Sequence, residues 1–194
     1  MSRNIFLYHS WVGRDSVFHF PMPKALNLVP PRKRATLIYS THKKITPDAI
    51  PITFAFRGNG IFDPEVGLGG QQPRGHDEYA LLYGKYYVVK SAISVAVKNL
   101  AGSQDPFAIC VYPYSDVTGD MPELMLASDP NNWYAQDRVK VVYPSGNDSS
   151  TDTNLIRYSC TSKQALGKGH DRNDVTALVA NDPSLQWYWK TTTQ

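Results

Sequence analysis

The chain has little cysteine, no long apolar run and few charged residues. Its two cysteines, Cys110 and Cys160, are too few for a disulfide framework. Both lie in strand-like runs, so we interpret them as buried free thiols in a reducing compartment. No stretch of about eighteen apolar residues occurs, so we expect no membrane-spanning segment. The N-terminus also makes a poor signal peptide, because its apolar patch is short. With 42% hydrophobic residues, the composition excludes a disordered chain, and its low charged share of 19% excludes a coiled coil.

Motifs of common catalytic and metal sites are also missing. The sequence contains no GxSxG elbow, phosphate-binding loop with its lysine, HExxH or CxxC. Its five histidines are scattered singly, which does not suit a metal site of three or four convergent ligands. Six acids offer the oxygen ligands that calcium prefers, namely Asp63, Glu65, Asp77, Glu78, Asp120 and Glu123. Their spacing matches no EF-hand, and we favour ordinary loop acids and helix caps. We therefore predict no enzymatic activity, no catalytic residue, no metal and no cofactor.

Turn-forming residues are frequent. The 13 glycines and 14 prolines give about one turn former every seven residues, which indicates short strands. Seven segments are predicted strands: 34–45, 50–58, 86–100, 107–115, 138–144, 155–166 and 185–193. Three are predicted to be helical: 76–86, a turn over 122–127 and a short segment within 170–183. The helices fall in the connections, so the sequence predicts an all-β fold of antiparallel strands, a sandwich, jelly roll or barrel, with short helices inserted in the loops.

Positive charge is concentrated at the front of the chain. Residues 1–44 hold eight Lys/Arg and one acid, a net charge of +7, whereas residues 45–194 hold twelve and sixteen, a net charge of −4. This asymmetry is consistent with a polyanionic partner for one face of the protein and equally with a basic surface that faces solvent. The candidate binding residues are Arg32, Lys33, Arg34, Lys43 and Lys44. We interpret 1–33 as an extended basic N-terminal arm and 34–194 as a single folded domain.

Two blocks of sequence resemble one known family. The first, residues 56–99, contains an FRGN–GIFDP element, a glycine-rich GQQPRGHD segment and a tyrosine-rich stretch that runs into a long strand. The second, NDVTALVANDPSLQWYW, spans residues 173–189. In this order the two blocks resemble the capsid proteins of circular, Rep-encoding single-stranded DNA viruses, the circo-like group. The resemblance covers about four fifths of the chain, from residue 34 to residue 190.

The resemblance implies a function and a location. It implies a single antiparallel jelly-roll sandwich that self-assembles into a small icosahedral (T=1) shell of about sixty copies. Such a shell packages single-stranded circular DNA through basic residues on its inner surface, here the five named above, and needs no membrane insertion. The protein is then expected in the virion, and in the nucleus or cytoplasm of the host cell during assembly. The alternatives are a non-viral jelly-roll binding module such as a lectin, and a glycosidase using Asp63 and Glu123.

The sequence departs from the family at both ends. The basic tail is thin, and the chain ends after the aromatic strand 185–193, so an eight-stranded roll lacks one strand. An unfilled position would leave rows of unpaired backbone groups. Three explanations stay open: residues 4–12 fill the gap, a neighbouring subunit donates a strand, or the chain is truncated. We further expect the loops 59–75 and 145–154 at subunit contacts or on the outer surface.

Overall fold

The computed structural model describes the chain in several ranges. They are 3–13, 30, 32–45, 52–67, 71–99, 108–115, 138–143, 154–167 and 170–193, with only the backbone described for 3–13 and 98–99. The helical turn predicted over 122–127 and nearly all of the loop 145–154 lie outside these ranges.

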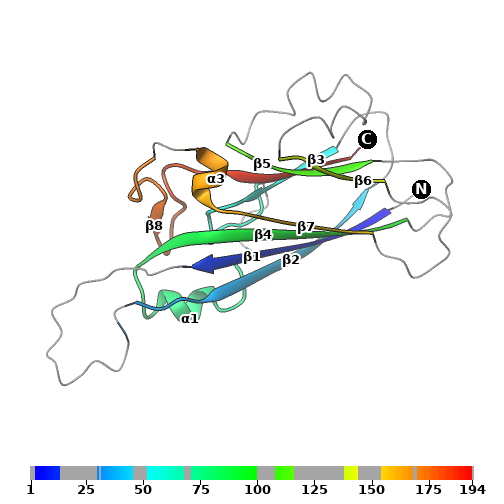
Figure 1. The fold of residues 1–194 in the computed structure, drawn as a ribbon. Helices are drawn as coiled ribbons and strands as arrows, with labels where there is room; N and C mark the ends of the chain where they lie inside the picture. The colour runs from blue at the N-terminus through cyan, green and yellow to red at the C-terminus, as the bar shows by residue number, and fades with distance from the viewer. Residues whose placement is uncertain are drawn as a thin grey trace, which may run out of the picture.

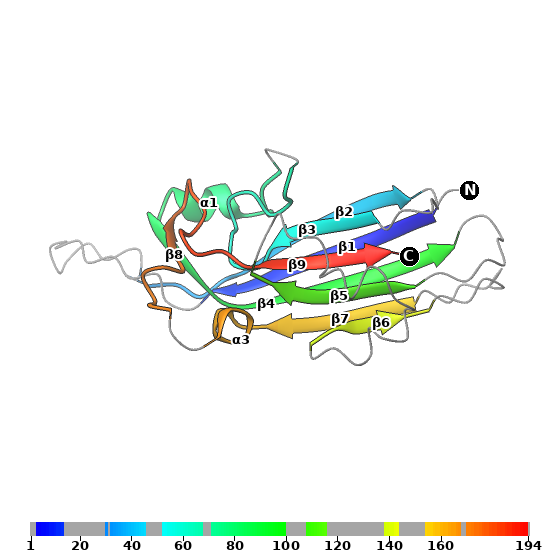
Figure 2. The ribbon, with the colours of Figure 1, turned by 90° about the horizontal axis from the view of Figure 1, so that it is seen from above.

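The described strands form two antiparallel sheets that pack against each other (Figure 1). The first sheet has the order β2-β1-β4-β7 and comprises β1 (Arg3–Gly13), β2 (Thr36–Ile45), β4 (Lys85–Asn99) and β7 (Asn154–Cys160). The short β8 (Thr176–Leu178) pairs with the start of β4. The second sheet has the order β3-β9-β5-β6 and comprises β3 (Ile52–Arg57), β9 (Tyr188–Thr193), β5 (Ile109–Tyr114) and β6 (Lys140–Val142). Figure 2 shows the second sheet lying over the first. The prediction of an all-β fold is confirmed.

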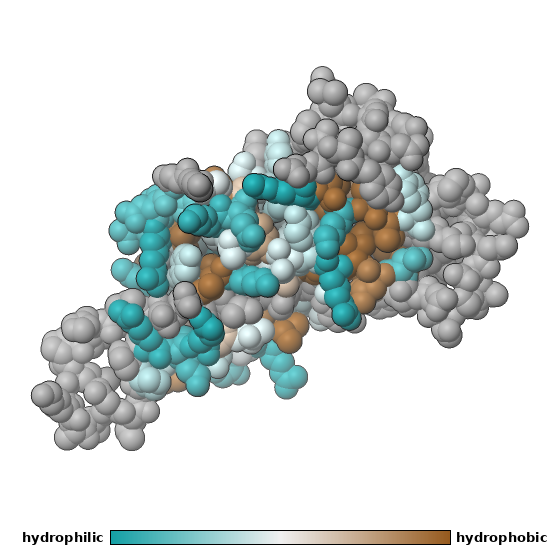
Figure 3. Space-filling model, viewed as in Figure 1, coloured by the Kyte–Doolittle hydropathy of each residue, from teal (hydrophilic) through white to brown (hydrophobic). Residues whose placement is uncertain are grey.

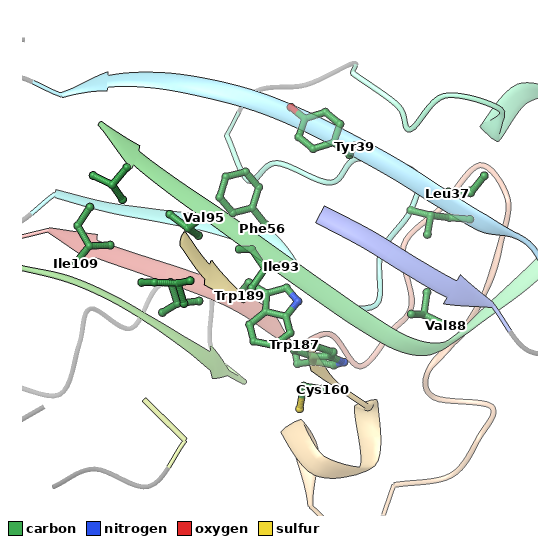
Figure 4. Close-up of a cluster of buried hydrophobic side chains, with 14 of the residues drawn as sticks. Leu37, Tyr39, Phe56, Val88, Ile93, Val95, Ile109, Cys160, Trp187 and Trp189 are labelled. Atoms are coloured by element: carbon green, nitrogen blue, oxygen red, sulfur yellow. The ribbon is translucent and has the colours of Figure 1, made fainter. Parts of the chain in front are cut away.

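The core lies between the sheets, where alternate residues of each strand meet (Figure 4). In β4, Ile93 and Val95 are buried as the period-two pattern predicts. Trp187 and Trp189 lie two residues apart, on one side of the predicted strand 185–193, and both are fully buried in the core. Their indole N–H groups donate hydrogen bonds to the Ser162 and Ser91 hydroxyls, at 3.0 and 2.9 Å respectively. Ser91 belongs to β4, so the Trp189 bond ties the second sheet to the first.

Both cysteines are buried free thiols, as predicted.

On the side of the molecule seen in Figure 3, hydrophilic side chains cover the end that holds α1 (His76–Ala80), α3 (Ser162–Leu166) and β8. Hydrophobic ones gather towards the opposite end, beside the segments drawn in grey.

The N-terminal segment fills the position for which three explanations were open. Strand β1 pairs antiparallel with β2 on one side and with β4 on the other, so that Val12 faces Thr36 and Lys90. The first explanation, residues 4–12 as the completing strand, is the one seen in the structure. The predicted arm 1–33 therefore contributes a strand to the sheet, and residues 14–29 lie outside the described ranges.

Three local predictions differ from the structure. The helix predicted over 76–86 ends at Ala80, because residues 85–87 pair with β8 and begin β4; Leu82 stays 56% exposed. The strand predicted over 155–166 ends at Cys160 and gives way to α3, where Thr161 and Gln164 form a capping box. Within 170–183 the structure has turns and β8 in place of a helix.

Candidate nucleic-acid interface

The described strands carry cations and no acids. They contain ten Lys/Arg, namely Arg3, Lys43, Lys44, Arg57, Lys85, Lys90, Lys98, Lys140, Arg157 and Lys190, and not one Asp or Glu. The acids of the described ranges all lie in connections: Asp63, Glu65, Asp77, Glu78, Asp171, Asp174 and Asp182. The sheets are therefore positively charged.

The outer face of the first sheet collects part of this charge. Inward residues alternate with outward ones, and the outward, exposed positions include Lys44 on β2, Lys90 on β4 and Arg157 on β7. These three residues define the basic face. Along the strands, Lys90 lies level with Thr36, because Val12 of β1 faces both residues, and Thr36 is eight residues before Lys44 on β2. Across the sheet, neighbouring strands are about 4.8 Å apart. The face therefore extends about 27 Å along the strands and about 14 Å across them. Such a surface can neutralise several phosphates of a strand lying on it.

Four of the five predicted binding residues are exposed. Arg32, Lys33 and Arg34 immediately precede β2, and Lys44 belongs to the basic face. All four can reach a polyanion in solvent. Lys43 is different, because its side chain lies on the opposite, inward side of β2.

Lys43 forms an ion pair with the buried carboxylate of Glu65. The Tyr39 hydroxyl donates a hydrogen bond to the same carboxylate at 3.0 Å. Burial, together with the negative charge of Glu65, raises the pKa of Tyr39 to about 12. The structure thus separates Lys43 from Lys44 and gives Lys43 a buried carboxylate partner. This arrangement is typical of a structural role, because a buried charge needs a counter-charge.

Lys90 and Arg157 were not among the binding residues predicted from the sequence. The alternation within 86–100 and 155–160 could have indicated them, because it sets both residues on the polar side of their strands. They were missed because strands far apart in sequence bring them onto one face with Lys44.

The two family-like blocks meet in a polar cluster. Arg57, at the end of β3, forms ion pairs with Asp182 at 3.0 Å and Asp63 at 3.5 Å, and its Nε donates to the Gln186 side chain at 3.1 Å. Burial raises the pKa of Asp182, while the Arg57 charge acts in the opposite direction. Asp63 is thus engaged by a guanidinium, which does not suit a catalytic acid or base with a free carboxyl. The other residue of the glycosidase alternative, Glu123, lies outside the described ranges.

The first half of the loop 59–75 packs inside the chain. Asn59 is fully buried, and Glu65 is 5% exposed. The expectation that 59–75 lies at subunit contacts or on the outer surface is wrong for this half. The reason is that the buried polar groups of Asn59 and Glu65 find their hydrogen-bond and ion-pair partners inside the fold.

Within the described ranges, no three His, Cys, Asp or Glu residues gather as metal ligands would.

Comparison with protein families, curated proteins and solved structures finds no match to the chain. Among the described residues, none of the helices has the length and apolar character that crossing a bilayer requires.

Proposed function

We propose that the chain is a viral coat protein that self-assembles into a small icosahedral shell and packages single-stranded DNA on its basic face. The order of the strands supports a jelly roll, in which eight strands form two four-stranded sheets. From β2 onward the chain runs through β3, β4, β5, β6, β7 and β9 and crosses repeatedly between the sheets. In this proposal β1 takes the place in the first sheet that the last strand of a jelly roll occupies.

The observation that carries the proposal is the set of acid-free strands with the basic face on one side. Lysine and arginine side chains on a sheet surface contact phosphates and release the counterions bound there. Such contacts fix the position of a strand without reading its bases. The exposed triplet 32–34 adds three more cations beside the start of β2. When many copies surround one lumen, these cations line a continuous surface for a polyanion.

Two matched double variants test the role of the basic face. Lys90→Ala with Arg157→Ala removes one lysine and one arginine from it. Arg138→Ala with Lys163→Ala removes the same charges from exposed positions before β6 and in α3, away from the basic face. Binding of a fluorescent thymidine oligonucleotide is measured against salt concentration. Each lost phosphate contact on a single strand changes the log–log slope by about 0.7, so the first variant should flatten it by about 1.4.

The control variant should keep the wild-type slope. Equal slopes for both variants would overturn the basic face as the binding surface. Assembly is tested separately by negative-stain microscopy of the purified protein, which should show regular shells of about 20 nm, the size expected for about sixty domains of this mass. Dispersed monomers under all assembly conditions would overturn the coat-protein proposal.

A further inference from the structure

A hollow with aromatic walls opens between the start of β2, α1 and the start of β4. Five rings line it, those of His76, Tyr79, Tyr83, Tyr86 and Tyr87, and aliphatic residues complete the wall. We call it the tyrosine pocket. The exposed Lys33 and Lys85 also line it, and no acid of the described ranges does. Aromatic walls with a cation at the edge suit a ligand that has a flat ring and a negatively charged group attached to it.

Several polar groups of the pocket are already used inside the chain. The Tyr83 hydroxyl donates to the Pro30 carbonyl oxygen at 3.1 Å, and the Tyr86 hydroxyl donates to the Asn181 carbonyl oxygen at 3.0 Å. The His76 Nε2 lies 3.0 Å from the Val179 carbonyl oxygen. These bonds hold the rings in place and leave mainly apolar atoms facing the hollow. A ligand here is bound by ring contact, with little hydrogen-bond readout of its edges.

The size of the pocket limits the ligand. Its cavity volume is about 70 Å³. At about 10–15 Å³ of cavity for each water, about five waters fit, which is about 150 Å³ of liquid. That is room for one base-sized ring system.

We propose that the tyrosine pocket binds the base of one unpaired nucleotide, with the adjoining phosphate at Lys33. The inference rests on the proposed function, because it takes a packaged single strand as the ligand. An unpaired base offers a π face to aromatic side chains whatever its identity, whereas a duplex keeps its bases stacked inside. Arg32 and Arg34 flank Lys33, so the mouth of the pocket attracts the phosphates on either side of the inserted base.

Two ligands with equal charge separate base binding from phosphate binding. One is a fluorescent thymidine 12-mer, and the other is the same 12-mer with abasic sites throughout. The wild-type protein should bind the thymidine 12-mer about tenfold more tightly, as contact of one base with aromatic rings predicts. Ala80→Leu fills the pocket from α1, so it should remove this preference while its affinity for the abasic 12-mer stays at the wild-type level.

A smaller substitution covers the case in which Ala80→Leu does not fold. In Ala80→Cys, maleimide labelling reports on position 80, because the native cysteines are buried. The thymidine 12-mer should slow this labelling, and the abasic 12-mer should not. Equal affinity of the wild type for both ligands, with a normal salt slope, would overturn the pocket and leave the proposed function standing. If the wild-type protein binds neither 12-mer in a salt-dependent way, the proposed function itself is overturned. Competition by octanoate, without any preference for thymidine, would overturn the nucleotide as ligand and indicate an amphiphilic anion.

Discussion

The side chain of Asn59 holds the backbone at Trp187. Its Oδ1 accepts a hydrogen bond from the Trp187 backbone N–H at 3.1 Å, and its Nδ2 donates to the Leu185 carbonyl oxygen at 2.8 Å. Beside it, Gly58 lies so close to the indole that an added Cβ would sit 2.3 Å from a ring carbon. The block that begins at Phe56 and the block that ends at Trp189 are therefore two halves of one structural unit. Their shared role is to seat Trp189 of β9 and Trp187 immediately before it.

Asn59→Ala should destabilise the protein without changing its binding surface. The substitution leaves the buried Trp187 N–H and the Leu185 carbonyl without their partner, which costs about 1–3 kcal/mol of the free energy of unfolding. Urea denaturation measures the change. Asn173→Ala, at an exposed position, is the matched control and should stay within about 0.5 kcal/mol of the wild type. A loss no larger than that of the control would contradict the role of Asn59 as a structural clamp.

Strand β1 should be essential for folding. Deletion of residues 1–12 removes the strand between β2 and β4, so two rows of backbone groups lose their partners, and soluble folded protein should be lost. If shell yield and melting temperature survive the deletion, the segment is a free arm.

The place of β1 can be tested without disrupting the fold. Ser10 lies opposite Ala92, and Cα atoms in antiparallel pairs are about 4.5–5.5 Å apart, a separation that a disulfide spans. Ser10→Cys with Ala92→Cys should give an oxidised monomer on a non-reducing gel. Ser10→Cys with Ser159→Cys is the control and should stay reduced, since Ser159 lies one strand further away, opposite Ala92. Covalent dimers from the first pair would indicate a strand exchanged between subunits.

The native thiols should be unreactive until the protein unfolds. Burial raises the pKa of Cys110 to about 12 and raises the pKa of Cys160 as well. At pH 8 the folded protein should take up no maleimide, and the unfolded protein should take up two per chain. Rapid labelling of the folded protein would show that the thiols are accessible.

The same burial makes stability depend on alkaline pH. The unfolded chain releases the Cys110 proton near pH 9, while the folded chain keeps it up to about pH 12. The folded state therefore binds more protons in this window, so the free energy of unfolding falls as pH rises from about 9. The free energy of unfolding of Cys110→Ala should fall less steeply than that of the wild type, as measured by denaturation midpoints from pH 8 to pH 10. Parallel slopes for the variant and the wild type would contradict this assignment.

The sequence by itself determined the class of fold and much of its core. Turn formers at short intervals limit the length of the segments between them, and the alternation in 86–100 places Ile93 and Val95 on one side whatever the neighbours are. The burial of Trp187 and Trp189 also followed from local pattern, because large rings two residues apart in a strand share a face. For the interface, the sequence identified the exposed residues 32–34 and Lys44 as candidates.

Only the tertiary structure decided which strands are neighbours and which side of each is covered. Alternation separates Lys43 from Lys44, but it was Glu65, buried beside β2, that made Lys43 an inward, paired residue. The basic face joins Lys44, Lys90 and Arg157 across four strands, and β1 lies between the first two although it begins the chain. Backbone hydrogen bonds between segments up to about a hundred residues apart set this order. Such bonds form between backbone groups that every residue carries, so no local pattern of side chains encodes the partner.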